Sequence, residues 1–292
     1  MKTNRDNLVG SLWMIAAMAG FAVEDSLVKA ATKTLPVAQV LVLFGLGGAL
    51  VFALNAFRLK DPLFSKAVIS PPMLVRVCFE ITGRLFYVLA LAYASLSSAT
   101  VILQATPLVV IAFAALFMGE TVGWRRWTAI FMGLLGVLVI LNPSADSFTW
   151  ASLLAVVGLL GFAGRDLASR AAPASLSTSV LGVYGFMAVA VAGGLYFLWE
   201  GRGAVALSSV VAWTMTGAVG AGVLAYACLM KAMRTGEVAA VTPFRYTRLL
   251  FGIAAAVFWF GETITANMVV GSGLIVLSGL FILMRGASKK AA

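Results

Sequence analysis

The chain alternates between long apolar runs and short polar connections. Ten runs are apolar enough to cross a bilayer as helices. Their lengths are at or near the value of about 20 residues that such a helix needs. Lipid admits only helices and closed barrels, and these runs lack the alternating pattern of barrel strands. The pattern therefore predicts an all-α membrane protein with ten transmembrane helices. Their expected ranges are 8–31, 36–57, 72–94, 97–118, 125–142, 150–170, 177–199, 208–232, 238–260 and 265–284.

The sequence contains two copies of one unit. Residues 20–30 are similar to residues 161–171, a shift of 141 positions, and residues 117–121 are similar to residues 259–263, a shift of 142. We therefore expect a five-helix repeat at 1–145 and a second at 146–292. Because five is odd, the second copy is inverted relative to the first. Inverted repeats are typical of secondary transporters, in which the two halves surround a central cavity that binds the substrate.

Composition excludes most other classes of protein. Hydrophobic residues make up 62% of the chain and charged residues 11%, whereas soluble proteins average about 25% charged. The chain has no histidine, and its two cysteines, Cys78 and Cys228, lie in separate apolar runs. We expect no metal, no cofactor and no catalytic residues. A lipid-modifying enzyme within the membrane is the alternative from another class, and the absence of histidine argues against it.

The positive charge is concentrated in alternate connections. With the N-terminus in the cytoplasm, we count twelve lysines and arginines in the inner segments and two, Lys33 and Arg202, in the outer ones. By the positive-inside rule, both termini lie in the cytoplasm and the protein spans the inner membrane. The net charge of +10 is thus explained by topology. The expected partners are a lipid bilayer and a small-molecule substrate, with no nucleic acid, for a monomer or weak homo-oligomer.

A Gly-Glu step follows the fourth run of each half, at residues 119–120 and 261–262. Pro107 lies thirteen residues before the first of these glutamates, and Gly136 lies sixteen after it. Together with the five-plus-five duplication, these features resemble EamA-type ten-helix exporters of the drug/metabolite transporter superfamily. The run 243–251 also resembles the ninth span of bacterial members. Among characterised groups, the chain is similar to YddG-type exporters of amino acids, including aromatic ones.

The resemblance implies an amino-acid exporter that works by alternating access. Export of drug-like cations or of another small metabolite is the alternative within the same class. A cavity dominated by acids, with the arginines turned away, would favour a cation. Pro107 and Pro243 are the hinge candidates, although the two prolines differ by about six positions in the repeat alignment.

The third run carries polar residues at helical spacing. Arg76, Glu80, Arg84 and Tyr87 follow one another at steps of four, four and three, so they share one helix face. Charges at the bilayer centre normally face a cavity or a partner. One hypothesis is that Glu80, Arg84 or both contact a zwitterionic substrate, or that Glu80 takes up a proton. The alternative is that an internal ion pair such as Glu80 with Arg84 locks the bundle, with Arg76 reaching the inner interface of the membrane.

The ninth run carries Arg245, Tyr246 and Arg248 just after Pro243. Proline removes one helical hydrogen bond and bends the helix, and arginine binds carboxylates with a planar two-pronged donor set. One hypothesis is that an arginine holds the substrate carboxylate while Tyr246 packs on the substrate side chain. The alternative is that the arginines neutralise acids on neighbouring helices.

The duplicated unit contains charged pairs at spacing i, i+4. Asp25 with Lys29 and Asp166 with Arg170 are equivalent pairs, which the inversion places near opposite membrane faces. They are gate candidates, or interfacial pairs that anchor helix ends. Glu24 has no acidic counterpart in the second half and is a candidate for proton coupling. Tyr184 is a candidate for an aromatic-accepting cavity wall. The repeated glycines are expected to let helices approach closely.

Overall fold

The fold comes from a computed structural model that describes residues 4–93, 102–119, 122–142, 152–201, 203–260 and 265–288. Within these ranges every regular element is a helix, and each predicted span has a counterpart. The boundary expected between residues 145 and 146 falls outside them. The helices are α1 (Asn4–Ala31), α2 (Val37–Leu59), η1 (Lys66–Ile69), α3 (Pro71–Tyr93), α5 (Thr106–Phe117), α6 (Trp124–Leu141), α7 (Ser152–Ala171), α8 (Thr178–Glu200), α9 (Ser209–Thr235), α10 (Val238–Val241), η3 (Thr242–Tyr246), α11 (Thr247–Phe260) and α12 (Ala266–Ser288).

Five helices of the described chain are long and apolar enough to cross a membrane: α1, α2, α7, α8 and α9. Helix α5 and the segment Ala266–Phe281 of α12 are shorter apolar stretches. Large apolar side chains such as Phe57 and Leu198 are more than 80% exposed. An apolar outer surface of this kind is suited to lipid, as the hydropathy of the sequence predicts.

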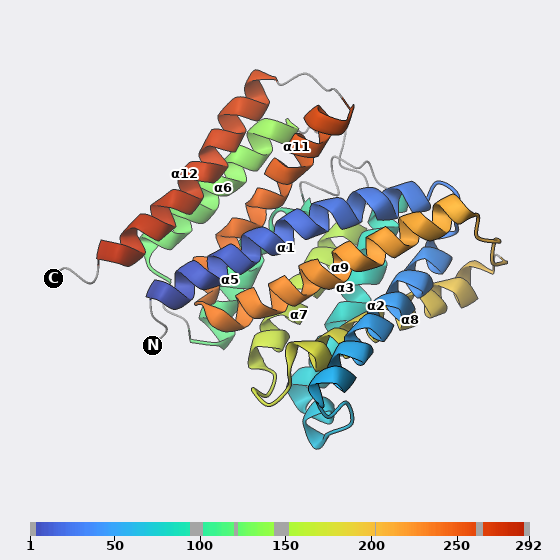
Figure 1. Ribbon diagram of the computed structural model, residues 1–292. Helices are drawn as coiled ribbons and strands as arrows, with labels where there is room; N and C mark the ends of the chain where they lie inside the picture. The colour runs from blue at the N-terminus through green and yellow to red at the C-terminus, as the bar shows by residue number, and fades with distance from the viewer. Residues whose placement is uncertain are drawn as a thin grey trace.

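The helices associate in four antiparallel pairs. Helix α1 packs along α9, α2 along α8, α3 along α7, and α6 along α12. In Figure 1 the α6–α12 pair lies on one side of the molecule and the α2–α8 pair on the other, with the remaining pairs between them. Each pair joins one helix from the first half of the sequence to one from the second half.

The pairing follows the symmetry expected of an inverted repeat. A shift of about 141 positions converts α1 into α7 and α3 into α9, so the α1–α9 contact becomes the α7–α3 contact. The same exchange maps the α2–α8 and α6–α12 pairs onto themselves. The glycines that begin the duplicated unit confirm this relation. A Cβ added at Gly20 would lie 2.8 Å from Ala225, and one added at the equivalent Gly161 would lie 2.4 Å from Gly83.

Close helix contact explains several further glycines. A Cβ at Gly136 would lie 2.6 Å from the carbonyl oxygen of Gly271, and Gly133 lies against the ring of Tyr246. The expectation of close packing is thus confirmed for these positions. The sequence also predicts close packing at Gly273, which is wrong, because a Cβ added there would meet no atom within 4 Å.

The fourth and ninth spans are broken at equivalent positions. Helix α5 begins at Thr106 and α11 at Thr247, 141 residues apart. Both threonine hydroxyls donate to a carbonyl three residues back, that of Leu103 and that of Phe244 respectively. The breaks therefore coincide in the repeat although the prolines do not. Pro107 lies in the first turn of α5, and Pro243 lies in the 3₁₀ turn η3.

The start of α1 and the end of α12 lie at the same end of the bundle, which we call the terminal end (Figure 1). The contacts agree with this placement. The side chain of Asn7 accepts a hydrogen bond from the backbone of Glu237, and the Glu237 carboxylate pairs with Arg126 at the start of α6. Helix α6 runs antiparallel to α12, and Ser278 in the middle of α12 donates to the carbonyl of Ala129 in the first half of α6. An even number of spans produces this arrangement. We call the opposite end the far end.

Candidate functional site

Two networks of charged side chains lie among the central helices. The first, called the five-residue network, contains Arg76, Glu80, Arg165, Asp166 and Arg245. The second, called the four-residue network, contains Glu24, Asp25, Arg84 and Arg248. The two networks draw on α1, α3, α7 and the η3–α11 segment, so both halves of the chain contribute.

The five-residue network is a continuous chain of ion pairs. Arg165 Nη1 lies 3.1 Å from Glu80 Oε1, and Arg165 Nε donates to Asp166 Oδ1 at 2.8 Å. The second oxygen of Asp166 accepts from Arg245. The side chains of Glu80 and Asp166 are fully buried. Because a lone buried charge is costly, these groups stabilise the bundle only as a connected set.

Tyr226 and Ser169 connect Arg76 to this chain. The Tyr226 hydroxyl accepts from Arg76 and donates to Glu80 Oε2 at 2.8 Å. Arg76 Nε donates to the Ser169 hydroxyl at 2.8 Å. Arg76 is fully buried, so it does not reach the membrane interface as one of the sequence hypotheses required. Sequence reasoning did not select Tyr226, whose equivalent in the first repeat is Arg84.

The four-residue network is smaller and partly open. Arg84 Nη1 lies 3.2 Å from Glu24 Oε1, and Arg248 donates two hydrogen bonds to Asp25 Oδ2. The Glu24 side chain is 2% exposed, whereas that of Asp25 is 38% exposed. One pair is therefore sealed among the helices, and its neighbour is accessible.

A single short segment joins the two networks. Arg245 and Arg248 stand three residues apart at the break of the ninth span, and each is bound by an aspartate of a different half. Asp25 and Asp166 are the same position of the two repeats, shifted by 141 residues. The η3–α11 junction is thus held between equivalent carboxylates of α1 and α7.

An aromatic cluster lies beside the arginines. The rings of Phe44 and Phe186 are 5.1 Å apart, and Tyr226 packs edge-on against Phe186 at 5.3 Å. The guanidinium of Arg84 lies 5.3 Å from the centre of the Phe44 ring, a cation–π contact. Phe44 and Phe186 are themselves related by the repeat, which is the sequence signal that could have identified them.

The ion pairs predicted at spacing i, i+4 are wrong. Asp25 pairs with Arg248 and not with the exposed Lys29, and Asp166 pairs with Arg165 and Arg245 in place of Arg170. Glu80 and Arg84 likewise do not pair with each other: Arg84 binds Glu24 of α1, and Glu80 binds Arg165 of α7 as well as Arg76 of its own helix. Burial explains the difference, because facing helices offer these groups partners that are shielded from water. The hypothesis that the arginines neutralise acids of neighbouring helices describes the contacts correctly.

Arg170 and Arg234 link the ends of α7 and α9 at the terminal end by reciprocal hydrogen bonds. Arg170 at the end of α7 donates to the carbonyls of Met233 and Gly236 at the end of α9, at 3.0 and 2.6 Å. Arg234 of α9 donates to carbonyls after α7, including that of Pro173 at 3.0 Å. The two arginines border a pocket of about 400 Å³. Arg170 remains a gate candidate, with the carbonyls of Met233 and Gly236 as its partners in place of Asp166.

The three candidate tyrosines have separate environments. The fully buried Tyr246 donates to the carbonyl of Ile130 at 3.2 Å and packs with Val137 and Ile275. Its ring therefore lies between α6 and α12, away from the ion pair of Arg245. Tyr184 donates to the carbonyl of Leu63 in the connection after α2. Tyr87 packs edge-on against Phe162 and remains beside the networks.

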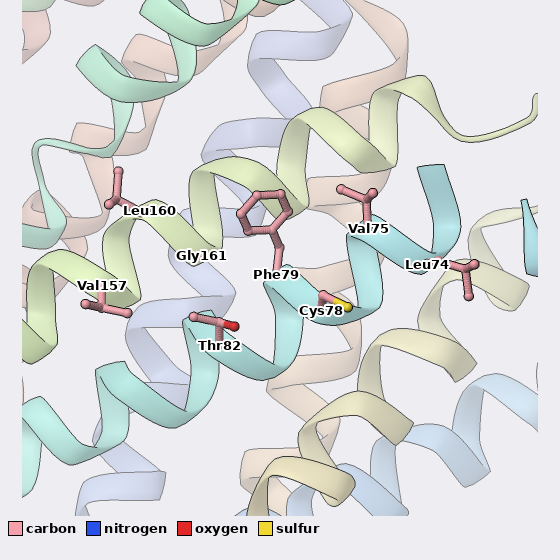
Figure 2. Close-up of a pocket in the computed structure, with 8 residues that line it drawn as sticks. All are labelled: Leu74, Val75, Cys78, Phe79, Thr82, Val157, Leu160 and Gly161. Atoms are coloured by element: carbon pink, nitrogen blue, oxygen red, sulfur yellow. The ribbon is translucent and has the colours of Figure 1, made fainter. Parts of the chain in front are cut away.

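A groove of about 560 Å³ lies on the opposite face of α3 from its charged residues. Figure 2 shows the apolar side chains of α3 and α7 that border it, together with Cys78 and Thr82. Phe79 forms part of its wall and covers Gly164. The groove is part of the apolar outer surface and is separate from both networks. Among the described residues, no cluster of three metal-ligating side chains is present.

Comparison with known proteins agrees with this architecture. Residues 8–142 match the EamA-like transporter family. The chain is thus related to membrane transporters of small metabolites, and its multiple membrane spans are consistent with that family. The Gly-Glu steps that first indicated the relation lie partly outside the described residues, because residues 120 and 261–262 are not among them.

The similar proteins are transporters named for different cargoes. The pseudopaline exporter CntI of Pseudomonas aeruginosa is 29% identical over 92% of this chain and 94% of its own length. The riboflavin transporter of Vibrio cholerae is 28% identical over 97% and 95%. The S-adenosylmethionine uptake transporter of Rickettsia bellii is 27% identical over 72% and 70%. These relatives support a transporter and do not single out amino acids.

A solved structure shows the same fold. It is titled only "Crystal structure of protein", and it superimposes with a TM-score of 0.79 at 18% identity. The match covers 99% of this chain and all of the other. At this identity the likeness concerns the fold alone.

Proposed function

We propose that this protein is a secondary transporter that exports amino acids, including aromatic ones, across the inner membrane by alternating access. Both termini would lie in the cytoplasm, because the terminal end carries most of the lysines and arginines. The pseudopaline exporter among the relatives supports outward transport, and the uptake transporters leave the opposite direction as the alternative.

The balance of buried charge is the observation that carries this proposal. The two networks contain five arginines and four acids, so one positive charge is in surplus (five minus four). Uncompensated charge is costly within a bilayer. A cargo with a carboxylate would supply the missing negative charge, and its amino group would find the acids nearby. An aromatic cargo would find the cluster of Phe44, Phe186 and Tyr226 beside the arginines.

The same balance disfavours a cationic cargo. A drug-like cation would require acids in excess and arginines turned away from the centre. Instead the arginines of both networks are 77% buried or more in their side chains and face the acids. Adding a cation would increase the surplus of positive charge. Riboflavin and the other metabolites for which the relatives are named remain second candidates for the cargo, because these relatives match nearly the whole chain.

The two aspartate–arginine pairs are the proposed gates. Asp166 lies five residues before the end of α7 at the terminal end, and Asp25 lies six before the end of α1 at the far end. Opening one pair while the other stays closed would expose the centre to one side at a time. Pro107 and Pro243, at the breaks of the fourth and ninth spans, are the proposed hinges. Glu24, buried beside Arg84, is the proposed site of proton coupling.

Efflux from proteoliposomes tests the cargo. Vesicles containing the purified protein are preloaded with labelled phenylalanine, tryptophan, leucine or glutamate, and parallel vesicles with riboflavin or S-adenosylmethionine. Release of amino acids above that from protein-free vesicles is the expected result. Release of riboflavin or S-adenosylmethionine without any amino acid would reject the proposed cargo while leaving a transporter in place. A proton gradient applied in either direction tests the role of Glu24.

A further inference from the structure

The break of the ninth span contains buried hydrogen-bond donors that lack partners. Within the described part of the chain, Thr242 Oγ1 and Arg245 Nε are buried atoms with no hydrogen-bond partner. Thr242 is fully buried and Arg245 is 8% exposed. Buried polar groups are nearly always paired, so two orphaned donors in one short segment require an explanation.

The local backbone places these two side chains together. Residues 242–246 form the 3₁₀ helix η3, which has three residues per turn. Side chains three positions apart are eclipsed in such a helix, so Thr242 and Arg245 stand on the same face. Thr247, by contrast, uses its hydroxyl on the carbonyl of Phe244 at 2.7 Å. The Thr247 hydroxyl is thus satisfied by the local backbone, whereas the Thr242 hydroxyl is not.

Arg245 is only partly used by its ion pair. Asp166 accepts from Nη2, and its other oxygen is taken by Arg165. The Nε–H of the Arg245 guanidinium therefore remains available as a donor. At the two shifts of the repeat, 141 and 142, the equivalent positions of the first half are Gln104 and Leu103, so the duplicated half lacks a charged donor here.

We propose that Thr242 and Arg245 form a subsite for a carboxylate group of the cargo. The hydroxyl of Thr242 would donate to one carboxylate oxygen and Nε of Arg245 to the other. A carboxylate suits this pair because it has two acceptor oxygens and no donor of its own. The assignment rests on the proposed transport function, deepens it to a cargo class with a free acid group, and adds Thr242 to the site.

The placement of the subsite connects it to the gates. Asp166 competes for the same guanidinium, so a bound acid weakens the hold of α7 on the ninth span. Arg248 stands one further turn along and is held by Asp25 of the other half. An acid at Thr242 and Arg245 thus acts directly on the segment that both halves hold.

Protection of an engineered thiol tests the subsite without any assumption about the cargo. Thr242→Cys is prepared with Cys78→Ala and Cys228→Ala and reconstituted in proteoliposomes, and its labelling by N-ethylmaleimide is timed. Acetate and benzoate are compared with acetamide and benzamide, which have the same shapes without the charge. We expect the acids to slow labelling at least fivefold more than the amides. Adding Arg245→Gln is expected to abolish the difference.

Thr247→Cys in the same background is the matched control and should show no preference for acids. Equal protection by acids and amides, or a Thr242→Cys variant whose thiol is never labelled, would overturn the subsite. Chloride that protects as well as acetate would also overturn it, because the site would then bind any small anion. Separately, Thr242→Val should weaken binding of a transported acid about tenfold and Thr247→Val less than about twofold.

The two proposals fail in different ways. Acid-selective protection without any amino-acid efflux would reject amino acids as cargo and retain the subsite. Amino-acid efflux with no acid-selective protection would retain the transporter and reject Thr242 as a cargo-binding residue.

Discussion

Asp25 and Asp166 occupy the same position of the two repeats but differ in nearly everything around them. Asp166 is fully buried and binds two arginines, whereas the side chain of Asp25 is 38% exposed and binds one. The residue before Asp25 is Glu24, and the residue before Asp166 is Arg165. The backbone of the repeat is therefore shared while the charges have diverged. A symmetric scaffold with asymmetric charges can alternate between two states and still bind its cargo in one orientation.

The largest expected difference is in stability. Asp166→Ala leaves Arg165 and Arg245 without their shared acid, and removing one partner of a buried pair costs about 3–5 kcal/mol. Asp25→Ala breaks a partly exposed pair, for which about 1 kcal/mol or less is expected. Unfolding of the purified variants by heat in detergent measures both. Equal losses would show that the two aspartates are not as different as their surroundings indicate.

The arginines of the broken span should dominate transport. Arg245→Ala and Arg248→Ala each remove charged hydrogen bonds of about 1.5–3 kcal/mol, so efflux should fall roughly ten- to a hundredfold. Arg245→Lys should not restore it, because lysine lacks the planar fork. Arg58→Ala, at an exposed position of the terminal end, is the control and should transport normally. Unaltered efflux in either central variant would reject its role in cargo binding.

The equivalent glycines should also differ, by a smaller amount. Gly161→Ala places a methyl group against the backbone of Gly83, and such overpacking costs about 1–3 kcal/mol. Gly20→Ala should cost less, because its added methyl group would lie 2.8 Å from the nearest atom, the Cβ of Ala225, whereas at Gly161 the nearest atoms lie at 2.4 Å. Gly220→Ala in α9 meets no atom within 4 Å and should be neutral. The order of thermal midpoints checks this series, and a destabilised Gly220→Ala would contradict the packing argument.

The smallest effect is expected at a hydroxyl. Tyr226→Phe removes the bridge between Arg76 and Glu80 and should lower the free energy of unfolding by about 1 kcal/mol. Efflux should fall several-fold, because the five-residue network loses its connection to Arg76. Tyr246→Phe breaks a single bond between α6 and the ninth span and should leave efflux within about twofold. Identical transport by the two variants would mean that Tyr226 only stabilises the fold.

Most of the architecture could be predicted from the sequence. A hydrophobic run is visible in neighbouring residues, and a repeat is found by comparing one part of the chain with another. The ten spans, the polar face of α3 and the close approach at Gly20 and Gly161 all follow from such signals. The partners in the ion pairs could not be predicted from these signals. Asp25 was expected to bind Lys29 four residues away, whereas its partner Arg248 is more than two hundred residues distant in sequence.

The sequence predicted several residues of the candidate site but not the contacts that they make. Arg245 and Arg248 were correctly selected as unusual intramembrane charges, but Tyr246, between them, points to α6 and α12. Thr242 and Tyr226 carried no signal, because a threonine or tyrosine in an apolar run is commonplace. Their importance depends on which neighbours they meet and which donors remain unpaired.

The sequence by itself determined that the chain crosses the membrane many times, that it consists of two inverted halves, and that arginines and acids lie within its spans. These features depend on composition and periodicity along one chain. Only the tertiary structure decided which acid holds which arginine, where the ninth span breaks, and which donors are left for a ligand. Those outcomes depend on how helices rotate and pack against each other, and ion pairs form wherever burial makes an unpaired charge most costly.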